Sequence, residues 1–567
     1  MLIKGIAASF GIAIGKVYIQ DNRDLIINKY PINDIEKELT RLSNAQKSCK
    51  LDLEKLIVKT KSNIGNKESE IIQTHLDIID DEGFFDDVKS IIKNDKFNSE
   101  FAIDSVTKTV ISSLEEIEDE YIKARIIDIK DVSTRIIKCL LNIADDMSTG
   151  LTSACILTAK DLKPSETAQL DTNQILGFVT QEGSKTSHTS IFAKALGIPA
   201  IVGIPNLLSH VKSNDLIILD GENGILHINP DIKTLAKYAE RKDSYDEEVR
   251  KLEKLKNIPC KTLDNFNVKL YANAGTLNEV ESAIKNGCMG IGLFRTEYLF
   301  MNTTSLPTEE YQFNFYKKIV EMLDDKPITI RTLDIGGDKE VECLKLPDEK
   351  NPFLGYRGIR ICLDNVELFK IQLKAILRSS SYGNVRIMFP MISSTEELES
   401  SLLILNNVKS ELKLNNMDFN ENIKVGMMIE IPSAVIISDM LSKKVDFFSI
   451  GTNDLIQYSN AVDRMNQKVS SLYTHFSPSI LRMLKLILNN ANFSNIEVGI
   501  CGEAANDINL IPLLISMGFN ELSIGPSTLL KIKEKINSLN KNNLEYVYEK
   551  VRQMTKSIEI EEYLKRL

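Results

Sequence analysis

The chain has 567 residues, 43% of them hydrophobic and 26% charged, which is typical of globular proteins and too long for one ordinary core. Its formal net charge of -10 excludes the bulk positive field of nucleic-acid binders, so a phosphate-bearing ligand needs a local cluster of cations. The eight cysteines stand singly along the sequence, which excludes a CxxC zinc site or disulfide framework and indicates a reducing cytoplasm.

The N-terminal stretch is apolar, but Lys4, Lys16 and recurrent glycines interrupt it. Its alternation predicts two strands joined by a tight turn rather than a helix. An uninterrupted apolar run of about 18 residues occurs nowhere in the sequence. We therefore expect a protein that is neither exported nor inserted into a membrane.

From Asn33 to about Ala144 the pattern becomes helical, because Leu and Ile recur at three- and four-residue spacing among Lys and Glu. This stretch predicts a bundle of about four helices. A purely structural bundle and a docking bundle remain equally open.

Short apolar runs separated by turn residues return near Leu151, with helical patterns between them. They predict an α/β domain into which the bundle is inserted. The expected limits are residues 1–22 and 145–230 for the α/β domain, 23–144 for the bundle and 231–260 for a charged linker helix.

From Val268 onward, strand-like runs alternate with helical patterns eight times, which predicts a (β/α)8 TIM barrel within residues 261–567. In that fold the catalytic groups lie at the carboxyl ends of the strands. The polar residues expected at these ends are Arg295, Glu297, Arg331, Asp334, Glu430, Asn453, Asp454 and Cys501.

Several arginines fall within the predicted barrel. Each guanidinium offers a planar fork of donors that grips phosphate or carboxylate oxygens in pairs. Taken singly, each arginine fits a surface charge or ion pair better, but several together near strand ends indicate a ligand with more than one anionic group. The arginines are Arg295, Arg331, Arg357, Arg360 and Arg464.

Glu430 and Asp454 end the predicted fifth and sixth strands, where two carboxylates would converge on a hard cation such as Mg²⁺. The alternative is a pair of helix N-cap acids. Cys501 fits either a small buried hydrophobe or an exposed proton donor or nucleophile. Together these residues indicate metal-assisted chemistry on a small dianionic or trianionic acid.

His188, one of five histidines, lies in TSHTS before the helical pattern IFAKAL. At a helix N-terminus an anion on the ring would meet backbone N–H groups and the positive end of the helix dipole. The alternative is a simple helix cap. A phosphohistidine intermediate would explain an anion site in one domain and a nucleophile in another. Further donors and cations nearby are Thr186, Ser187, Thr189, Ser190, Lys185 and Lys194.

Along its whole length the sequence resembles the Enzyme I family of phosphoenolpyruvate-protein phosphotransferases. The motifs that carry the resemblance are GIAASFGIAIGKVYI, DLKPSETAQL, TSHTS, GLFRTEYLFM, RTLDIGGDK, NPFLGYRGIR, IMFPMI, MMIEIPSA, SIGTNDLIQY, AVDR and GICGEAA, in the family's order. The resemblance implies transfer of phosphate from phosphoenolpyruvate to His188, with Thr167 as a hydroxyl partner, and then to a histidine phosphocarrier protein that docks on the bundle. It also implies a homodimer through the barrel.

The resemblance assigns roles in the barrel as well. Arg295, Arg331 and Arg464 would hold the phosphate and carboxylate of phosphoenolpyruvate, in a pocket shared with Arg357, Asn453 and Asp454. Mg²⁺ would be bound by Glu430 and Asp454, and Cys501 would protonate the enolate on the way to pyruvate.

Some positions depart from the family's pattern. Ser184 and Lys185 replace a glycine and an arginine before TSH, and Lys194 replaces an arginine in the following helix. Lysine keeps the charge but loses the bidentate fork. Asn506 also stands where small residues are usual, with no consequence that the sequence reveals.

Two other functions account for parts of the sequence. Pyruvate phosphate dikinase and phosphoenolpyruvate synthase share the histidine domain and the barrel, but they need an ATP-binding domain, which does not precede GIAASFG here. A silent scaffold that only binds the phosphocarrier is disfavoured because His188 and the barrel residues occur together.

Overall fold

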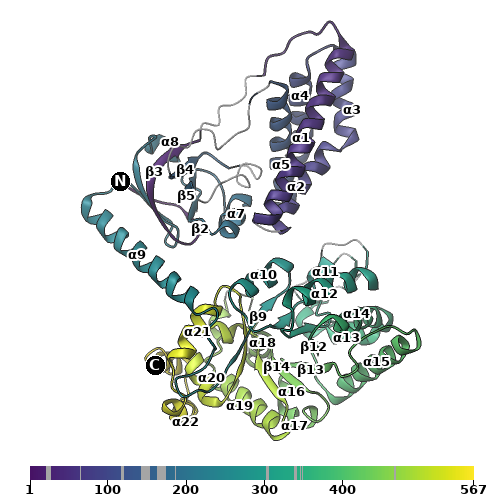
Figure 1. Cartoon of the computed structure of the whole chain (residues 1–567), viewed down its shortest axis with the longest axis vertical. Coiled ribbons are helices and arrows are strands. Elements are labelled where there is room, and N and C mark those ends of the chain that lie inside the picture. Colours follow the sequence, from purple (N-terminus) through teal and green to yellow (C-terminus); the bar gives the residue numbers. More distant parts are fainter. Residues whose placement is uncertain are drawn as a thin grey trace. The chain divides into compact units, whose positions relative to one another are not determined.

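The computed structural model divides into two compact units, Met1–Glu248 and Val249–Leu567 (Figure 1). It describes residues 1–20, 27–63, 66–115, 120–141, 143, 154–162, 174–184, 187–301, 305–337, 341, 343–344, 346–347, 349–464, 466 and 468–567. Within these ranges, none of the helices is both long enough and apolar enough to cross a membrane.

The first unit contains a mixed sheet in which the N-terminal strands pair with strands from beyond the helical insertion. The strand order is β1-β8-β7-β3-β4-β5-β6-β2, and β3 to β6 run parallel to one another. β3 and β4 are neighbours in the sheet, so the helices between them in the sequence are an insertion between two adjacent strands. The strands are β1 (Leu2–Lys4), β2 (Ile6–Ser9), β3 (Ile12–Ile19), β4 (Cys155–Ala159), β5 (Ile175–Thr180), β6 (Ala200–Val202), β7 (Leu216–Asp220) and β8 (Ile225–Ile228).

The inserted helices form a bundle with its own buried cluster, which includes Leu53, Ile72 and Ile103. Phe192 of α7 (His188–Leu196) also belongs to this cluster, so the helix that begins at His188 packs with the bundle. The bundle's elements are α1 (Ile35–Asn63), α2 (Asn66–Ile79), α3 (Glu82–Ser90), the π-helical turn η1 (Ile91–Asp95), α4 (Ser99–Glu115) and α5 (Glu120–Leu140).

Two further helices follow in the chain, α8 (Leu207–His210) in the first unit and α9 (Ile232–Lys254), which begins in the first unit and ends in the second. The amino-terminal half of α9 is tied to the sheet through Asp220, the fully buried last residue of β7. Asp220 Oδ2 accepts hydrogen bonds from Arg241 Nη1 at 3.0 Å and from Tyr238 Oη at 3.2 Å. Burial opposes ionisation of Asp220, but the hydrogen bonds from Asn223 and Arg241 outweigh it and lower its pKa.

The second unit is a closed barrel of parallel strands, which confirms the predicted fold class (Figure 1). Its strands are β9 (Lys269–Ala274), β10 (Ile291–Phe294), β11 (Ile328–Arg331), β12 (Val385–Phe389), β13 (Lys424–Ile429), β14 (Phe447–Ile450), β15 (Glu497–Ile500) and β16 (Glu521–Ile524).

Helices follow each barrel strand. Those from β9 to β12 are α10 (Leu277–Lys285), α11 (Tyr298–Met301), α12 (Glu309–Leu323), η2 (Pro352–Leu354), α13 (Ile359–Asp364), α14 (Val366–Ser379), η3 (Ser380–Tyr382) and α15 (Thr395–Leu414). Those after β13 are α16 (Pro432–Ile436), α17 (Ser438–Leu441), α18 (Thr452–Asn460), η4 (Ser470–Leu472), α19 (Pro478–Phe493), η5 (Glu503–Asn506), α20 (Ile511–Met517), α21 (Leu529–Ser538), η6 (Asn542–Leu544), α22 (Glu545–Val551) and α23 (Ser557–Leu564).

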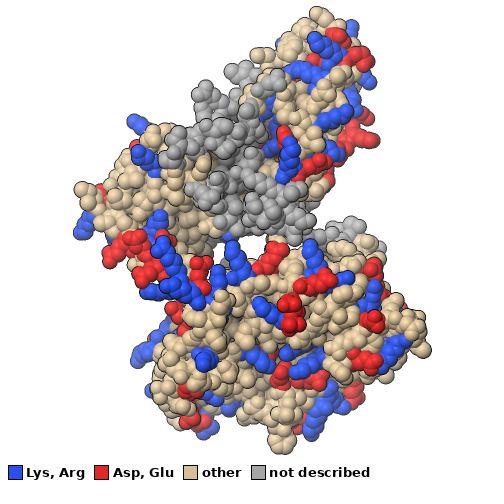
Figure 2. Space-filling view, viewed as in Figure 1, with Lys and Arg blue, Asp and Glu red and all other residues tan. Residues whose placement is uncertain are grey.

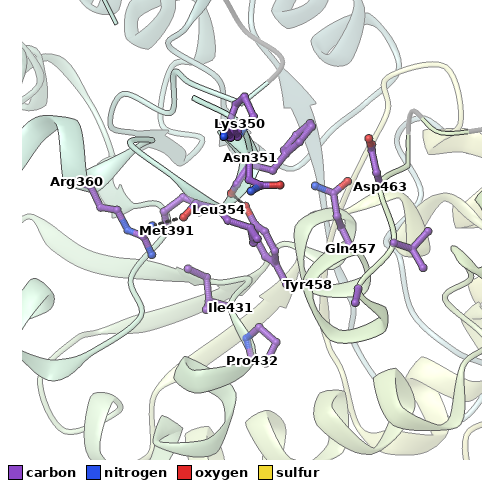
Figure 3. Close-up of a pocket in the computed structure, with 14 residues that line it drawn as sticks. Lys350, Asn351, Leu354, Arg360, Met391, Ile431, Pro432, Gln457, Tyr458 and Asp463 are labelled. Atoms are coloured by element: carbon purple, nitrogen blue, oxygen red, sulfur yellow. Dashed lines mark hydrogen bonds between the residues drawn. The ribbon is translucent and has the colours of Figure 1, made fainter. Parts of the chain in front are cut away.

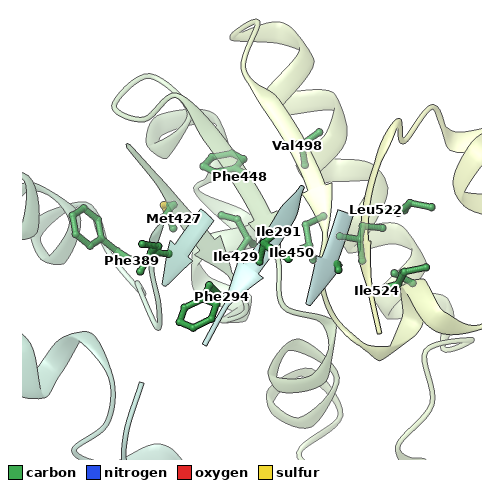
Figure 4. Packing of buried hydrophobic residues seen from close by; sticks show 14 of the residues in the cluster. Ile291, Phe294, Phe389, Met427, Ile429, Phe448, Ile450, Val498, Leu522 and Ile524 are labelled. Atoms are coloured by element: carbon green, nitrogen blue, oxygen red, sulfur yellow. The ribbon is translucent and has the colours of Figure 1, made fainter. Parts of the chain in front are cut away.

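Alternate residues of the barrel strands belong to two different cores. Ile291, Phe294, Ile429 and Phe448 are part of the large cluster shared with the helices (Figure 4). Their neighbours form a small separate cluster, because successive side chains of a strand point to opposite faces. Its members are Leu293, Met388, Met428, Phe447 and Cys501. This inner cluster fills the barrel beneath the mouth.

An ion-pair network lies at the opposite, amino end of the strands. Arg386 Nη1 binds Glu497 Oε2 at 2.9 Å, and Lys269 Nζ binds Glu497 Oε1 at 3.0 Å. Burial raises the pKa of Glu521, which lies 3.5 Å from Lys269 Nζ in the same network. On the surface of the barrel unit that Figure 2 displays, acidic and basic side chains are interspersed rather than gathered by sign.

Candidate active site

A pocket of about 320 Å³ lies at the carboxyl ends of the barrel strands. It is lined by all the barrel residues to which the family resemblance assigns a role: Arg295, Arg331, Arg357, Glu430, Asn453, Asp454, Arg464 and Cys501. Leu293 and Met428 of the inner cluster line it as well. The pocket therefore combines a floor from the barrel core with walls of charged side chains.

Strand ends explain how these residues converge. Arg331 is the last residue of β11, while Arg295, Glu430 and Cys501 directly follow β10, β13 and β15. Asn453 and its neighbour Asp454 begin α18 after β14. Carboxyl ends of parallel barrel strands meet at one rim, so sequence-distant residues become neighbours.

Asp334 holds two buried arginines in place. Its Oδ2 lies 3.1 Å from Arg331 Nη1, and its Oδ1 accepts a hydrogen bond from Arg357 Nε at 3.1 Å. Arg331 also pairs with Glu297. Burial works against the charge of Arg331, but the carboxylates of Glu297 and Asp334 raise its pKa. Both arginines are thus fixed in the charged form.

Arg357 is only 2% exposed and is surrounded by oxygen acceptors. Its Nη1 and Nη2 donate to the two carboxylate oxygens of Asp454 at 3.1 and 3.0 Å, and Nη1 also donates to Tyr458 Oη at 3.1 Å. Burial opposes its charge, whereas Asp334 and Asp454 raise its pKa. Its guanidinium therefore fixes the positions of the Asp334 and Asp454 carboxylates.

Arg295 differs from these two arginines. Its side chain is exposed and makes no hydrogen bond or ion pair with any residue that the structure describes. Arg464 is half-buried, with its guanidinium 5.9 Å from the ring centre of Phe353. The pocket thus has an exposed guanidinium, that of Arg295, and two buried guanidinium groups that are paired with Asp334.

Glu430 carries a buried oxygen that lacks a partner. Its Oε1 accepts the Met391 N–H at 2.6 Å, while Oε2 has no hydrogen-bond partner among the described residues. Burial and the charges of Asp454 and Asp334 raise the pKa of Glu430 to about 8. A Cβ at Gly451 would lie 2.9 Å from Oε2, so the glycine leaves room there.

This donor set fits a hard divalent cation. A cation would satisfy Glu430 Oε2 and relieve its repulsion with Asp454. In the described part of the chain no group of three or more His, Cys, Asp or Glu side chains is arranged to hold a metal. Two carboxylates suit Mg²⁺, which retains waters and takes further oxygens from its substrate.

Cys501 has features both of a small buried hydrophobic residue and of a proton donor, the two roles that the sequence left open. It is 3% exposed and packs in the inner cluster, yet it lines the pocket. Burial raises the pKa of its thiol to about 11, against the opposing effects of a hydrogen bond with Ser449 and of the charge of Arg331. The thiol is consequently protonated near neutral pH, as a proton donor requires.

The histidine segment is described only in part. Thr167 and Lys185 lie outside the described residues, and so does the side chain of His188. Helix α7 begins at His188, and Lys194 is an exposed residue of its last turn. The Ser184 carbonyl accepts hydrogen bonds from Ser187 Oγ at 2.9 Å and Ser190 Oγ at 2.6 Å, so two hydroxyl groups tie the start of α7 to Ser184.

The structure gives some residues near the pocket a role that the sequence did not indicate. Glu297 and Asp334 were expected at strand ends but received no role, although ion pairs with the arginines give them one. The sequence did not indicate Tyr458, which binds Arg357 but does not line the pocket. It lies four residues after Asp454 on α18 and hence on the same helix face. That spacing was the available signal.

Asn506 has a structural explanation. Its Oδ1 accepts hydrogen bonds from Gly525 N at 2.8 Å and from Thr528 Oγ1 at 2.9 Å. It therefore ties the turn after β15 to the connection between β16 and α21.

A second cavity of about 630 Å³ is lined partly by residues 350–354 of the loop that bears Arg357 (Figure 3). Tyr458, which binds Arg357, lines it and donates a hydrogen bond to the Phe353 carbonyl at 2.5 Å. Arg360, grouped with the pocket arginines by sequence, lines this cavity instead. Its Nη1 donates to the carbonyls of Leu354 and Gly355 at 3.2 and 2.9 Å. Hydrogen bonds from Tyr458 and Arg360 thus fix the loop that bears Arg357.

Comparison with known proteins shows the family. Models of PEP-utilising enzymes match the N-terminal region at residues 4–125, the mobile domain at 151–224 and the PEP-binding domain at 249–541. The chain is 40% identical over 563 residues to the phosphoenolpyruvate-protein phosphotransferases of Priestia megaterium and Bacillus subtilis strain 168, covering 99% of this chain and 98% and 99% of theirs.

The phosphoenolpyruvate-protein phosphotransferase of Staphylococcus aureus strain MRSA252 is 41% identical over 544 residues, or 96% of this chain and 95% of that protein. An NMR solution structure of an Enzyme I protein, nEIt, is 37% identical with a TM-score of 0.38, covering 43% of this chain and 99% of its own. The near-complete coverage of the named proteins, together with the three matched regions, establishes that this chain belongs to the phosphoenolpyruvate-protein phosphotransferases, the Enzyme I family of PEP-utilising enzymes.

Proposed function

We propose that this chain takes a phosphoryl group from phosphoenolpyruvate onto His188, releases pyruvate and passes the group to a histidine phosphocarrier protein. The observation that carries the proposal is the meeting of eight expected residues in one pocket. Its size and its excess of guanidinium forks suit a small acid with a phosphate and a carboxylate. The printed names of the matched relatives support the same reaction.

In this proposal the arginines divide the binding of phosphoenolpyruvate. The exposed Arg295 and the half-buried Arg464 grip its outer oxygens, and Asn453 helps to line the pocket. Arg331 and Arg357 are held beforehand by Asp334 and therefore need little rearrangement when negative charge shifts in the transition state. Cations that are already in position stabilise the transition state more than the ground state and so lower the activation barrier.

Glu430 and Asp454 would hold Mg²⁺, which would neutralise charge on the phosphoryl oxygens. Asp454 already accepts both hydrogen bonds from Arg357, so its position is fixed before any cation arrives. The unpartnered Oε2 of Glu430 supports this assignment.

Cys501 would complete the reaction on the carbon side. When the phosphorus–oxygen bond breaks and His188 Nε2 takes the phosphoryl group, the remaining enolate needs a proton on its methylene carbon. The raised pKa of Cys501 keeps that proton on Sγ until the enolate forms. The products are phosphohistidine and pyruvate.

The remaining expectations belong to the same proposal. The bundle of α1 to α5 would dock the phosphocarrier, the barrel would form a homodimer, and the chain would act in the cytoplasm. Lys185 and Lys194 would offer charge near the phosphohistidine, with Thr167 as a hydroxyl partner. The rival scaffold has no need for a protonated thiol beside a cluster of arginines.

Labelled phosphoenolpyruvate with Mg²⁺ and the phosphocarrier tests the proposal. Wild type should acquire acid-labile label and pass it to the carrier. His188→Ala should acquire none, whereas His210→Ala, which changes another histidine of the same unit, should behave as wild type. Undiminished label on His188→Ala would reject the nucleophile, and an unlabelled wild type would favour the scaffold.

A further inference from the structure

Two thiols meet inside the helical bundle. Cys49 of α1 and Cys139 of α5 are separated by 90 positions in the chain, yet their Sγ atoms are 2.9 Å apart. Neither thiol is part of a disulfide bond in the structure. Because a disulfide bond is about 2.05 Å long, the sulfurs need to approach by less than about 1 Å to join. We propose that Cys49 and Cys139 form a reversible redox dithiol that closes when the protein meets a low-molecular-weight disulfide.

The two thiols differ in access. Cys49 is fully buried, whereas Cys139 is half-buried in the last turn of α5. The Cys49 S–H donates its hydrogen bond to Cys139 Sγ, so the more accessible sulfur is the acceptor. This hydrogen bond, together with burial, raises the pKa of Cys49. An oxidant therefore reacts first with Cys139, the more accessible thiol, and Cys49 is the resolving thiol.

The exchange balances in two steps. Cys139 loses its proton and attacks one sulfur of the oxidant RS–SR, which forms a mixed disulfide and expels one thiolate. Cys49 then loses its proton and attacks Cys139 Sγ, which expels the second thiolate. The two protons convert the thiolates to two RSH molecules. The protein dithiol is oxidised by two electrons and the small disulfide is reduced by two.

The bond would tie the first helix of the bundle to its last. The closed loop contains α2, α3 and α4, so cross-linking restricts the unfolded chain and stabilises the folded bundle. Phe192 of α7 belongs to the same buried cluster as Cys49, which places the bond in the core that supports the histidine helix. The bond forms within the bundle and does not depend on whether the bundle docks a phosphocarrier.

Thiol mapping of the full chain tests the proposal directly. Wild type is incubated with oxidised glutathione, denatured, alkylated and digested. We expect a Cys49–Cys139 linked peptide that dithiothreitol removes, and a bundle unfolding midpoint raised by at least about 5 °C. Cys49→Ser should instead accumulate a glutathione adduct on Cys139, because the resolving thiol is missing.

Cys343 provides the matched control, since it is also half-buried but its Sγ contacts the Phe300 carbonyl at 3.5 Å. Cys343→Ser should form the linked peptide as readily as wild type. The proposal is overturned if wild type keeps both bundle thiols open to alkylation, holds a lasting adduct on Cys139, or links either cysteine to another partner. Mapping of wild type needs no variant to fold.

Discussion

At the scale of single residues, the pocket is built from charges that constrain one another. Asp334 accepts from two arginines, Arg357 donates to two carboxylates, and Glu430 is left with an oxygen that no described residue satisfies. Removing one partner of a buried pair strands the other charge, at a cost of about 3–5 kcal/mol. Substitution of Glu430 is different, because its Oε2 has no partner that the substitution would leave unpaired.

Glu430→Gln should stabilise the metal-free protein at pH 8 and above. The pKa of Glu430 is raised to about 8, so wild type loses stability as the pH rises from the unfolded value of about 4.3 through that range. Gln carries no charge and can still accept the Met391 N–H. Mg²⁺ should reverse the order, because it stabilises only the chain that binds it.

Thermal unfolding at pH 8 with a chelator and then with Mg²⁺ measures both effects. Glu503→Gln alters an exposed carboxylate of the same pocket and should show the wild-type response. Equal stabilisation of Glu430→Gln and wild type by Mg²⁺ would remove Glu430 from the cation site.

Cys501→Ala should slow pyruvate release about 10²- to 10⁴-fold while leaving phosphoenolpyruvate binding nearly unchanged. The thiol donates its proton, which is present below its pKa of about 11 and lost above it. Wild-type turnover should therefore fall as the pH approaches that value. Steady-state assays with Cys362→Ala, a buried thiol outside the pocket, provide the control. Turnover at the wild-type rate in Cys501→Ala would exclude it as the acid.

At the scale of secondary structure, the two ends of the barrel have separate tasks. The carboxyl ends of the strands bear the pocket, while the amino ends bear the network of Lys269, Arg386 and Glu497. Function and stability are thus carried by opposite ends of the same strands.

Glu497→Gln should reduce the stability of the barrel at pH 7 by about 1–2 kcal/mol, a value discounted for its partial exposure. Burial opposes its charge, but Arg386 and Lys269 lower its pKa, so its contribution is present above the unfolded pKa and lost as the pH falls.

Urea unfolding at pH 7 and pH 4 checks this, since the difference from wild type should shrink on acidification. Glu399→Gln breaks an exposed pair with Lys444 and should have little effect. An unchanged stability of Glu497→Gln at pH 7 would contradict the assignment.

The elements also show how far the sequence could predict the structure. The alternation of strands and helices placed Arg331, Glu430 and Cys501 at the rim, because strand ends follow from periodicity. Periodicity does not describe a loop, so the return of Arg357 onto Asp334 and Asp454 was not predictable. The network at Arg386 was missed for a related reason, since a charged residue near a strand's start gives no sign of its partners.

At the scale of the whole molecule, the proposed nucleophile and the pocket belong to different units. His188 begins α7 in the unit Met1–Glu248, and the arginine pocket lies in the unit Val249–Leu567. Splitting one difficult transfer into two steps through a covalent intermediate requires the histidine to visit the pocket. The barrel alone should then bind phosphoenolpyruvate without consuming it.

The coupling of pyruvate release to His188 phosphorylation tests this account most directly. In a single-turnover quench with Mg²⁺ and no phosphocarrier, we predict that wild type releases one pyruvate for each phosphoryl group gained by His188. His188→Ala should bind phosphoenolpyruvate but release no pyruvate above the uncatalysed rate. Pyruvate release from His188→Ala at the wild-type rate would contradict the account, because the barrel would then be passing the phosphoryl group to another acceptor.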